Sequence, residues 1–168
     1  IRTAALYHDI GKMEAPMYYI ENQSTGLNPH DELGYEESAQ IIIGHVSKGI
    51  EIAKRNGVPD KIIDFIRTHH GTTKTAYFFK MYMKENPGES EEDVVSLFTY
   101  PGPIPFSKES AALMMADSVE AASRSLKEPD VESIEKLVES IIGNQIKEGQ
   151  FENADITLRD IRLIKKMF

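Results

Sequence analysis

One stretch near the start of the sequence decides its interpretation: Ala5-Leu6-Tyr7-His8-Asp9-Ile10-Gly11-Lys12. The adjacent histidine and aspartate follow a short apolar run, which predicts that they lie at the end of a helix over residues 1–10. Neighbouring side chains on a helix point about 100° apart. Both can nevertheless reach a metal ion held at the end of a helix, and we expect Gly11 to cap that end.

Later parts of the sequence supply further candidate metal ligands. His45 shares the apolar face of a predicted helix over residues 36–56, and the doublet His69-His70 ends the next predicted helix. A lone inward histidine is more often a hydrogen-bonded core residue than a ligand, but this chain places most of its five histidines near acids and helix ends. We therefore predict a metal site made of His8, Asp9, His45, His69, His70 and Asp117. Six ligands exceed the needs of one tetrahedral ion, so they favour two ions that share Asp9.

Composition limits the other possibilities. The 168 residues suit one domain over residues 1–168, and no linker or internal repeat divides them. The chain has no cysteine, so a metal must be held by imidazole and carboxylate groups, as iron, manganese or zinc can be. The net charge of -8 argues against binding to a nucleic-acid polymer, which needs a basic face.

Apolar periodicity predicts an all-α fold. Few segments alternate with the period of a strand, whereas apolar residues recur at helical spacing in most of the chain. Residues 12–35 have no such period and predict a long loop with room for one short helix, and residues 96–107 predict an irregular crossing. We interpret the last two helices as scaffold or as the surface of a homodimer. The predicted helices cover residues 36–56, 59–70, 75–86, 108–126, 131–147 and 157–168.

The order of the histidines and acids resembles that of the HD-domain metal-dependent phosphohydrolases. Four stretches are similar to the cytosolic HD domain of the bacterial seven-transmembrane HD receptors, a family that hydrolyses cyclic di-AMP: Asn28–Asp31, His69–Thr73, Tyr100–Pro105 and Met115–Arg124. The resemblance runs from Ile1 to Phe168. It implies an HD-domain helical bundle with a dinuclear metal site. The family's first ligand histidine lies upstream of the His-Asp pair, so we expect this chain to lack that first helix.

The resemblance also implies a division of the ligands and a reaction. One ion would bind His8, Asp9, Asp117 and the upstream histidine, and the other would bind Asp9, His45, His69 and His70. With manganese or iron, the centre would open cyclic di-AMP to the linear dinucleotide pApA, which degrades a bacterial second messenger. Asp9 and Lys12 would be catalytic, since Lys12 could neutralise charge on the phosphate. The domain would be tethered at the cytoplasmic side of the membrane.

Several polar residues are candidates for contacts with the substrate. Lys12 and Arg124 could meet phosphates, while Tyr18, Asn28 and His30 lie in the long loop where phosphates or a base could bind. Each has an ordinary structural alternative. Lys12 could be a solvated surface lysine, Arg124 could form an ion pair between neighbouring elements, and the loop residues could simply make turns.

Other functions remain open. The related HD-GYP family, specific for cyclic di-GMP, has a Gly-Tyr-Pro signature after its histidine doublet, whereas Gly71-Thr72-Thr73 follows here. Hydrolases of dNTP or ppGpp use one ion and fewer histidines. An HD-fold di-iron oxygenase uses a similar ligand set to activate oxygen. A nucleotide sensor without turnover is the third class, and with the upstream histidine missing we expect weakened metal binding and impaired turnover in this chain.

Overall fold

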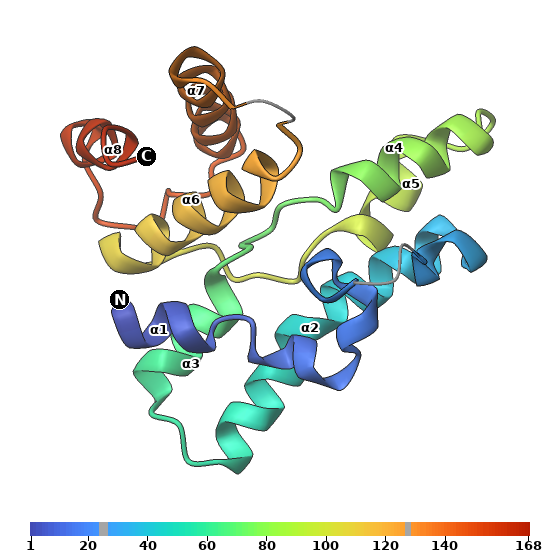
Figure 1. The fold of residues 1–168 in the computed structure, drawn as a ribbon, viewed down its shortest axis with the longest axis horizontal. Coiled ribbons are helices and arrows are strands. Elements are labelled where there is room, and N and C mark those ends of the chain that lie inside the picture. The colour runs from blue at the N-terminus through green and yellow to red at the C-terminus, as the bar shows by residue number, and fades with distance from the viewer. Residues whose placement is uncertain (24–26, 127–128) are drawn as a thin grey trace.

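The computed structural model describes residues 1–23, 27–126 and 129–168, and every regular element in these ranges is a helix (Figure 1). This confirms the predicted all-α fold. The only β-type pairing in the described residues is an isolated bridge between Lys74 and Thr99. The α-helices are α1 (Arg2–Tyr7), α2 (Tyr35–Arg55), α3 (Asp60–Thr68), α4 (Ala76–Glu85), α5 (Glu91–Val94), α6 (Lys108–Ser123), α7 (Val131–Lys147) and α8 (Leu158–Lys165).

The helices α7 and α8 begin at residues whose side chains cap them. The carboxylate of Asp130 accepts a hydrogen bond from the Ser133 N–H at the start of α7, and the hydroxyl of Thr157 accepts one from the Asp160 N–H at the start of α8. Both pairs form capping boxes, which satisfy backbone donors that have no partner inside the helix. Between α2 and α3, Gly57 takes a φ of +67°, which a glycine adopts without strain.

Two regions bury apolar side chains. In Figure 1, α6, α7 and α8 form one group, while α1, α2 and α3 form the other, with an irregular segment crossing between them. The first group has the larger apolar core, which contains Ala111, Met114, Met115, Val119, Val138, Ile142, Phe151 and Ile161. The second group has a small apolar cluster of Ala53, Ile63 and Ile66. The helix α6 packs against both α3 and α7, so it joins the two regions.

The structure corrects two predictions. The first helix ends at Tyr7, so Gly11 does not cap it but lies in the 3₁₀-helix η1 (Ile10–Glu14). The long loop holds more than one short helix: η2 (Pro16–Tyr18), η3 (Ile20–Asn22) and η4 (Pro29–Glu32) follow η1, and Gly26 falls outside the described residues. The irregular crossing predicted for residues 96–107 is confirmed only from residue 99 onward, because η5 (Val95–Phe98) covers its first three residues. None of the described helices combines the length and the apolar character needed to cross a membrane.

Candidate metal centre

Gly11 brings the His-Asp pair against α2. A Cβ atom on this residue would lie 1.8 Å from the carbonyl oxygen of His45 and 2.5 Å from the amide nitrogen of Gly49. Only glycine therefore lets η1 approach the α2 backbone this closely. The contact places Asp9, two residues earlier, beside the buried His45, so the glycine in His-Asp-Ile-Gly serves packing rather than capping.

Three histidines are oriented in the same way. The Nδ1 atoms of His8, His45 and His69 each pair with the backbone carbonyl three residues earlier, at 2.9, 2.6 and 2.7 Å. Since a carbonyl only accepts hydrogen bonds, Nδ1 must carry the proton in each ring. In the neutral ring, Nε2 then has a free lone pair, which is the state that binds metal.

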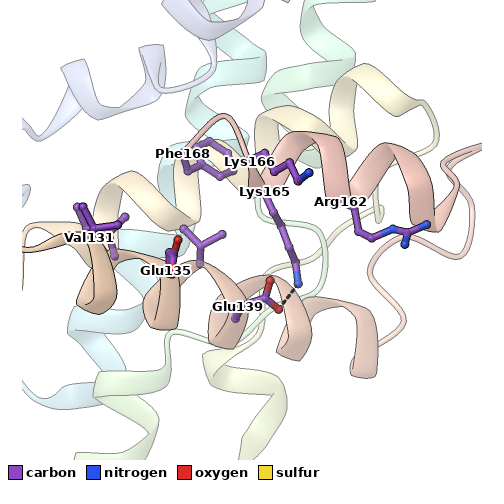
Figure 2. Close-up of a pocket in the computed structure, with 9 residues that line it drawn as sticks. Val131, Glu135, Glu139, Arg162, Lys165, Lys166 and Phe168 are labelled. Carbon is purple, nitrogen blue, oxygen red and sulfur yellow. Dashed lines mark hydrogen bonds and ion pairs between the residues drawn. The ribbon is translucent and has the colours of Figure 1, made fainter.

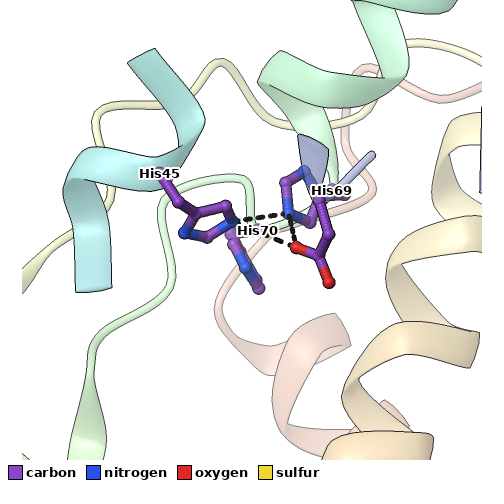
Figure 3. A group of neighbouring side chains, drawn as sticks. His45, His69 and His70 are labelled. Atoms are coloured by element: carbon purple, nitrogen blue, oxygen red, sulfur yellow. Dashed lines mark hydrogen bonds and ion pairs between the residues drawn. The ribbon is translucent and has the colours of Figure 1, made fainter. Parts of the chain in front are cut away.

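These lone pairs converge on Asp9. The Nε2 atoms of His45 and His69 lie 3.1 Å apart, and they lie 3.3 and 3.6 Å from Asp9 Oδ1 (Figure 3). His70 completes this group, in which one atom from each of the four side chains lies within 4.8 Å of the others. Asp9 Oδ1 is buried and has no hydrogen-bond partner among the residues that the structure describes. Acceptors facing one another in a buried site repel unless a cation lies between them, so the arrangement fits a metal ion.

A second group adjoins the first. It consists of His8, His69 and Asp117, again with ligand atoms within 4.8 Å. His8 Nε2 lies 3.2 Å from Asp117 Oδ1 and 3.2 Å from Asp9 Oδ2. His70 Nδ1 is 3.7 Å from Asp117 Oδ2. The six residues chosen from the sequence thus come together as two neighbouring groups, each able to hold an ion; the division of ligands between two ions stays a prediction.

The charges in the cluster depend on one another. Burial by itself raises the pKa of Asp9, but the surrounding imidazoles, His45 foremost, hold it well below its usual range. Burial lowers the pKa of His8, yet the carboxylates of Asp117 and Asp9 outweigh this and raise it to about 10. Burial, followed by the nearby histidines, lowers the pKa of His70 well below its usual value. A positive charge is therefore favoured between His8 and the two acids, and a metal ion can replace the proton there.

A groove of about 300 Å³ leads away from the metal ligands. His70, Asp117 and Tyr100 line this groove, together with Tyr77 and Phe78 of α4. A second cavity of about 360 Å³ also contacts Tyr77 and Phe78, and Asn28 and His30 line it. Tyr77 and Phe78 thus line both spaces. Asn28 and His30, two of the predicted substrate-binding residues, line the second cavity and not the groove beside the metal ligands.

The two predicted phosphate-binding cations are joined by an acid that the sequence did not single out. The Lys12 ammonium lies 2.7 Å from Asp9 Oδ2 and 2.8 Å from Glu21 Oε1. Arg124 lies 3.3 Å from Glu21 Oε2 and also pairs with Glu120 on its own helix. Lys12 therefore adjoins the metal cluster, whereas Arg124 makes the inter-element ion pair that was its structural alternative.

Two tyrosines near the cluster were also missed. Tyr100 stacks on His70 with ring centroids 4.2 Å apart, and burial raises the pKa of its phenol strongly. The Tyr19 hydroxyl donates to the Ile41 carbonyl, and the Lys12 ammonium lies over its ring. Neither lies on a periodic helix face, so spacing could not indicate them. Tyr18, the tyrosine that was chosen, packs against the ring of His30 instead.

A separate groove of about 500 Å³ lies between α7 and α8 (Figure 2). Val131 and Glu135 line it from α7, and Arg162 and Phe168 line it from the chain end that includes α8. The Lys165 ammonium pairs with Glu139 across it at 2.6 Å. None of the residues predicted for the metal site or the substrate contacts lines this groove.

Comparison with known proteins agrees with this geometry. A family model described as HD domain matches residues 1–122. The cyclic-di-AMP phosphodiesterase PgpH of Listeria monocytogenes is 43% identical over 165 residues, which are 98% of this chain and 22% of that protein. The protein of the same name from Bacillus subtilis is 41% identical, over 98% of this chain and 23% of its own length. The chain thus spans about a fifth of these relatives.

The same likeness holds in three dimensions. The crystal structure of the L. monocytogenes PgpH HD domain in complex with cyclic-di-AMP matches this chain with a TM-score of 0.93 and 42% sequence identity. The match covers 98% of this chain and 75% of that one. Together with the cluster of histidines and aspartates, these findings establish that the chain belongs to the HD domain family.

Proposed function

We propose that this chain hydrolyses cyclic di-AMP to the linear dinucleotide pApA with the help of two divalent metal ions. The observation that carries the proposal is the likeness to an HD domain crystallised with cyclic-di-AMP. The converging ligand atoms support it independently, because the cluster fits cations. Manganese and iron are the metals that we propose for the oxygen and nitrogen donors present.

Six side chains would hold the ions. Asp9, His45, His69 and His70 suit one position, and His8 and Asp117 suit the other, with the second oxygen of Asp9 reaching toward it. When bound, two such ions would polarise a phosphodiester and lower the pKa of a coordinated water. The carbonyl partners of the Nδ1 atoms keep the three anchored rings in the tautomer that binds metal.

Other residues would receive the substrate. Lys12, beside Asp9, would neutralise charge that develops on the phosphate oxygens. The groove lined by His70 and Asp117 would take the nucleotide, and Asn28 and His30 would contact any part that reaches the second cavity. Tyr18, which packs against His30, would contribute to substrate binding beside them. Arg124 would act as a more distant positive group.

Two further proposals concern the location and the assembly of the protein. The chain acts at the cytoplasmic side of a bacterial membrane within an anchored protein, and α7 and α8 form a homodimer surface.

The test compares nucleotides. The manganese-loaded chain is incubated without oxygen with cyclic di-AMP, cyclic di-GMP and ppGpp in separate reactions, and both binding and products are measured, by calorimetry and chromatography. We expect cyclic di-AMP to bind most tightly and to yield pApA, and a chelator to stop the reaction. Tighter binding or faster cleavage of another nucleotide would refute the substrate assignment. Oxygen consumption by the iron-loaded chain in an aerobic control would point to an oxygenase, and binding without cleavage to a sensor.

A further inference from the structure

His70 differs from the other three histidines of the cluster. His8, His45 and His69 are each fixed by a hydrogen bond to a carbonyl three residues earlier. His70 makes no such bond to any described residue, and it directly precedes Gly71, which has a positive φ and lies in a turn. Its ring stacks on Tyr100 instead, with an interplanar angle of 24°. Stacking restrains the plane of the ring, but the position of the backbone that carries His70 must be set by something else.

Gln150 holds that backbone. The Thr72 N–H donates to Gln150 Oε1 at 3.0 Å, and Gln150 Nε2 donates to the Thr72 hydroxyl at 3.0 Å. The Gln150 side chain is 2% exposed, so water does not compete for these bonds. The fit also requires Gly71, which has a φ of +52° and where a Cβ atom would lie 2.3 Å from Gln150 Oε1. The turn after His70 is therefore clamped from the segment that follows α7.

We propose that Gln150 is a positioning residue for the metal centre, acting through the turn at residues 71–72 on His70. The inference rests on the proposed function, since it takes the cluster to bind metal. It extends the site beyond residues 1–122, which the HD family model matches, into the region built on α6, α7 and α8. An amide so placed would orient a ligand from outside the ligand set, as groups behind metal ligands commonly do.

The test removes the clamp and measures metal binding rather than turnover. Gln150→Met keeps the length of the side chain but makes neither hydrogen bond. The chain and the variant are titrated with cobalt(II), and the visible absorption spectrum, which reports the ligand geometry, is recorded. We expect the variant to bind one cobalt ion about tenfold more weakly or worse, with an altered spectrum.

The control is Ile142→Val, which trims a fully buried core residue in the same region without touching the turn. It should lower stability and leave the cobalt titration unchanged. A second variant, Thr72→Val, removes only the hydroxyl part of the clamp and should weaken binding in the same direction but less. If Gln150→Met and Thr72→Val bind cobalt with the parent affinity and spectrum, Gln150 is merely structural and the inference fails. If the parent chain binds no cobalt, the proposed function itself fails.

Discussion

The region around α6, α7 and α8 and the region around α1, α2 and α3 differ in the kind of side chain that they bury. Around α6, α7 and α8 most of the buried side chains are apolar, and Met114, Met115 and Ile142 are fully buried. Around α1, α2 and α3 the most buried positions include His45 at 2% and His69 at 0% exposure. Burying polar groups costs free energy unless they are paired. The first region is therefore stabilised mainly by apolar packing, whereas the centre of the second is held by hydrogen bonds and has an arrangement that fits a cation.

The helix α6 belongs to both regions. Met114 and Met115 point into the apolar core, while Asp117, two residues later, joins His8 and His70. A rigid core thus holds one of the acids of the cluster at a set distance from the histidines. The comparison implies that two kinds of mutation should separate: changes to the clustered histidines and acids should cost activity and metal binding, and changes to the apolar core side chains should cost stability.

The largest effect is expected for Asp9→Ala. This variant removes the carboxylate that contacts both ligand groups, and we expect the rate of cyclic di-AMP cleavage to fall by about 1,000-fold or more, about 4 kcal/mol in the activation barrier. The measurement is a product assay at saturating manganese. The control variant is Asp155→Ala, which also removes one carboxylate, but from an exposed position outside the cluster. It should cleave cyclic di-AMP at the parent rate. If Asp9→Ala retained even a tenth of the parent activity, the cluster of histidines and acids would not be the centre on which cleavage depends.

Next comes Ile142→Ala in the apolar core. Ile142 has no exposed surface, and truncation of such a side chain costs about 2–5 kcal/mol of unfolding free energy. Because the residue does not touch the cluster, we expect the folded fraction to bind manganese normally. Urea unfolding followed by circular dichroism, together with a metal titration at low urea, tests both parts. A loss of metal binding in the folded state would mean that the two regions are coupled more tightly than the comparison implies.

Metal binding should stabilise the polar region in particular. At a free manganese concentration 100 times its dissociation constant, a ligand that binds only the folded state adds about 2.7 kcal/mol to the free energy of unfolding. Amide hydrogen exchange would locate the gain. We expect increased protection in α1, in α2 near His45 and in the turn at residues 69–73, with little change in α7 and α8. Equal added protection throughout the chain would contradict this.

The smallest effect concerns the cap of α8, at the edge of the apolar region. The backbone N–H and the hydroxyl of Thr157, with Lys108, lower the pKa of Asp160 from 3.8 to about 2. A carboxylate with a lowered pKa stabilises the folded state above pH 3.8, and the stabilisation is lost as the pH falls toward 2. Asp160→Asn should therefore be slightly less stable than the parent near neutral pH and equal to it near pH 2. A pH-independent difference in urea midpoint would show that charge is not the cause.

Much of this could be predicted from single residues and their spacing. Helical periodicity predicted both ends of α2 and of α7 to within a residue. The metal-ligand candidates could also be predicted from the sequence, because histidines are uncommon on the apolar faces and at the ends of helices. Gly11 was noticed too, but its role was wrong, since a cap and a close helix contact leave the same glycine in the sequence.

The remaining features depend on elements far apart in the chain. Glu21 meets Arg124, Tyr100 meets His70, and Gln150 meets Thr72, and none of these pairs leaves a periodic or local signal. The sequence alone determined the main helices and the chemical types available for a metal centre, because these depend on neighbours within a few residues. Only the tertiary structure decided which side chains orient the ligands, because that depends on how separate helices pack against one another.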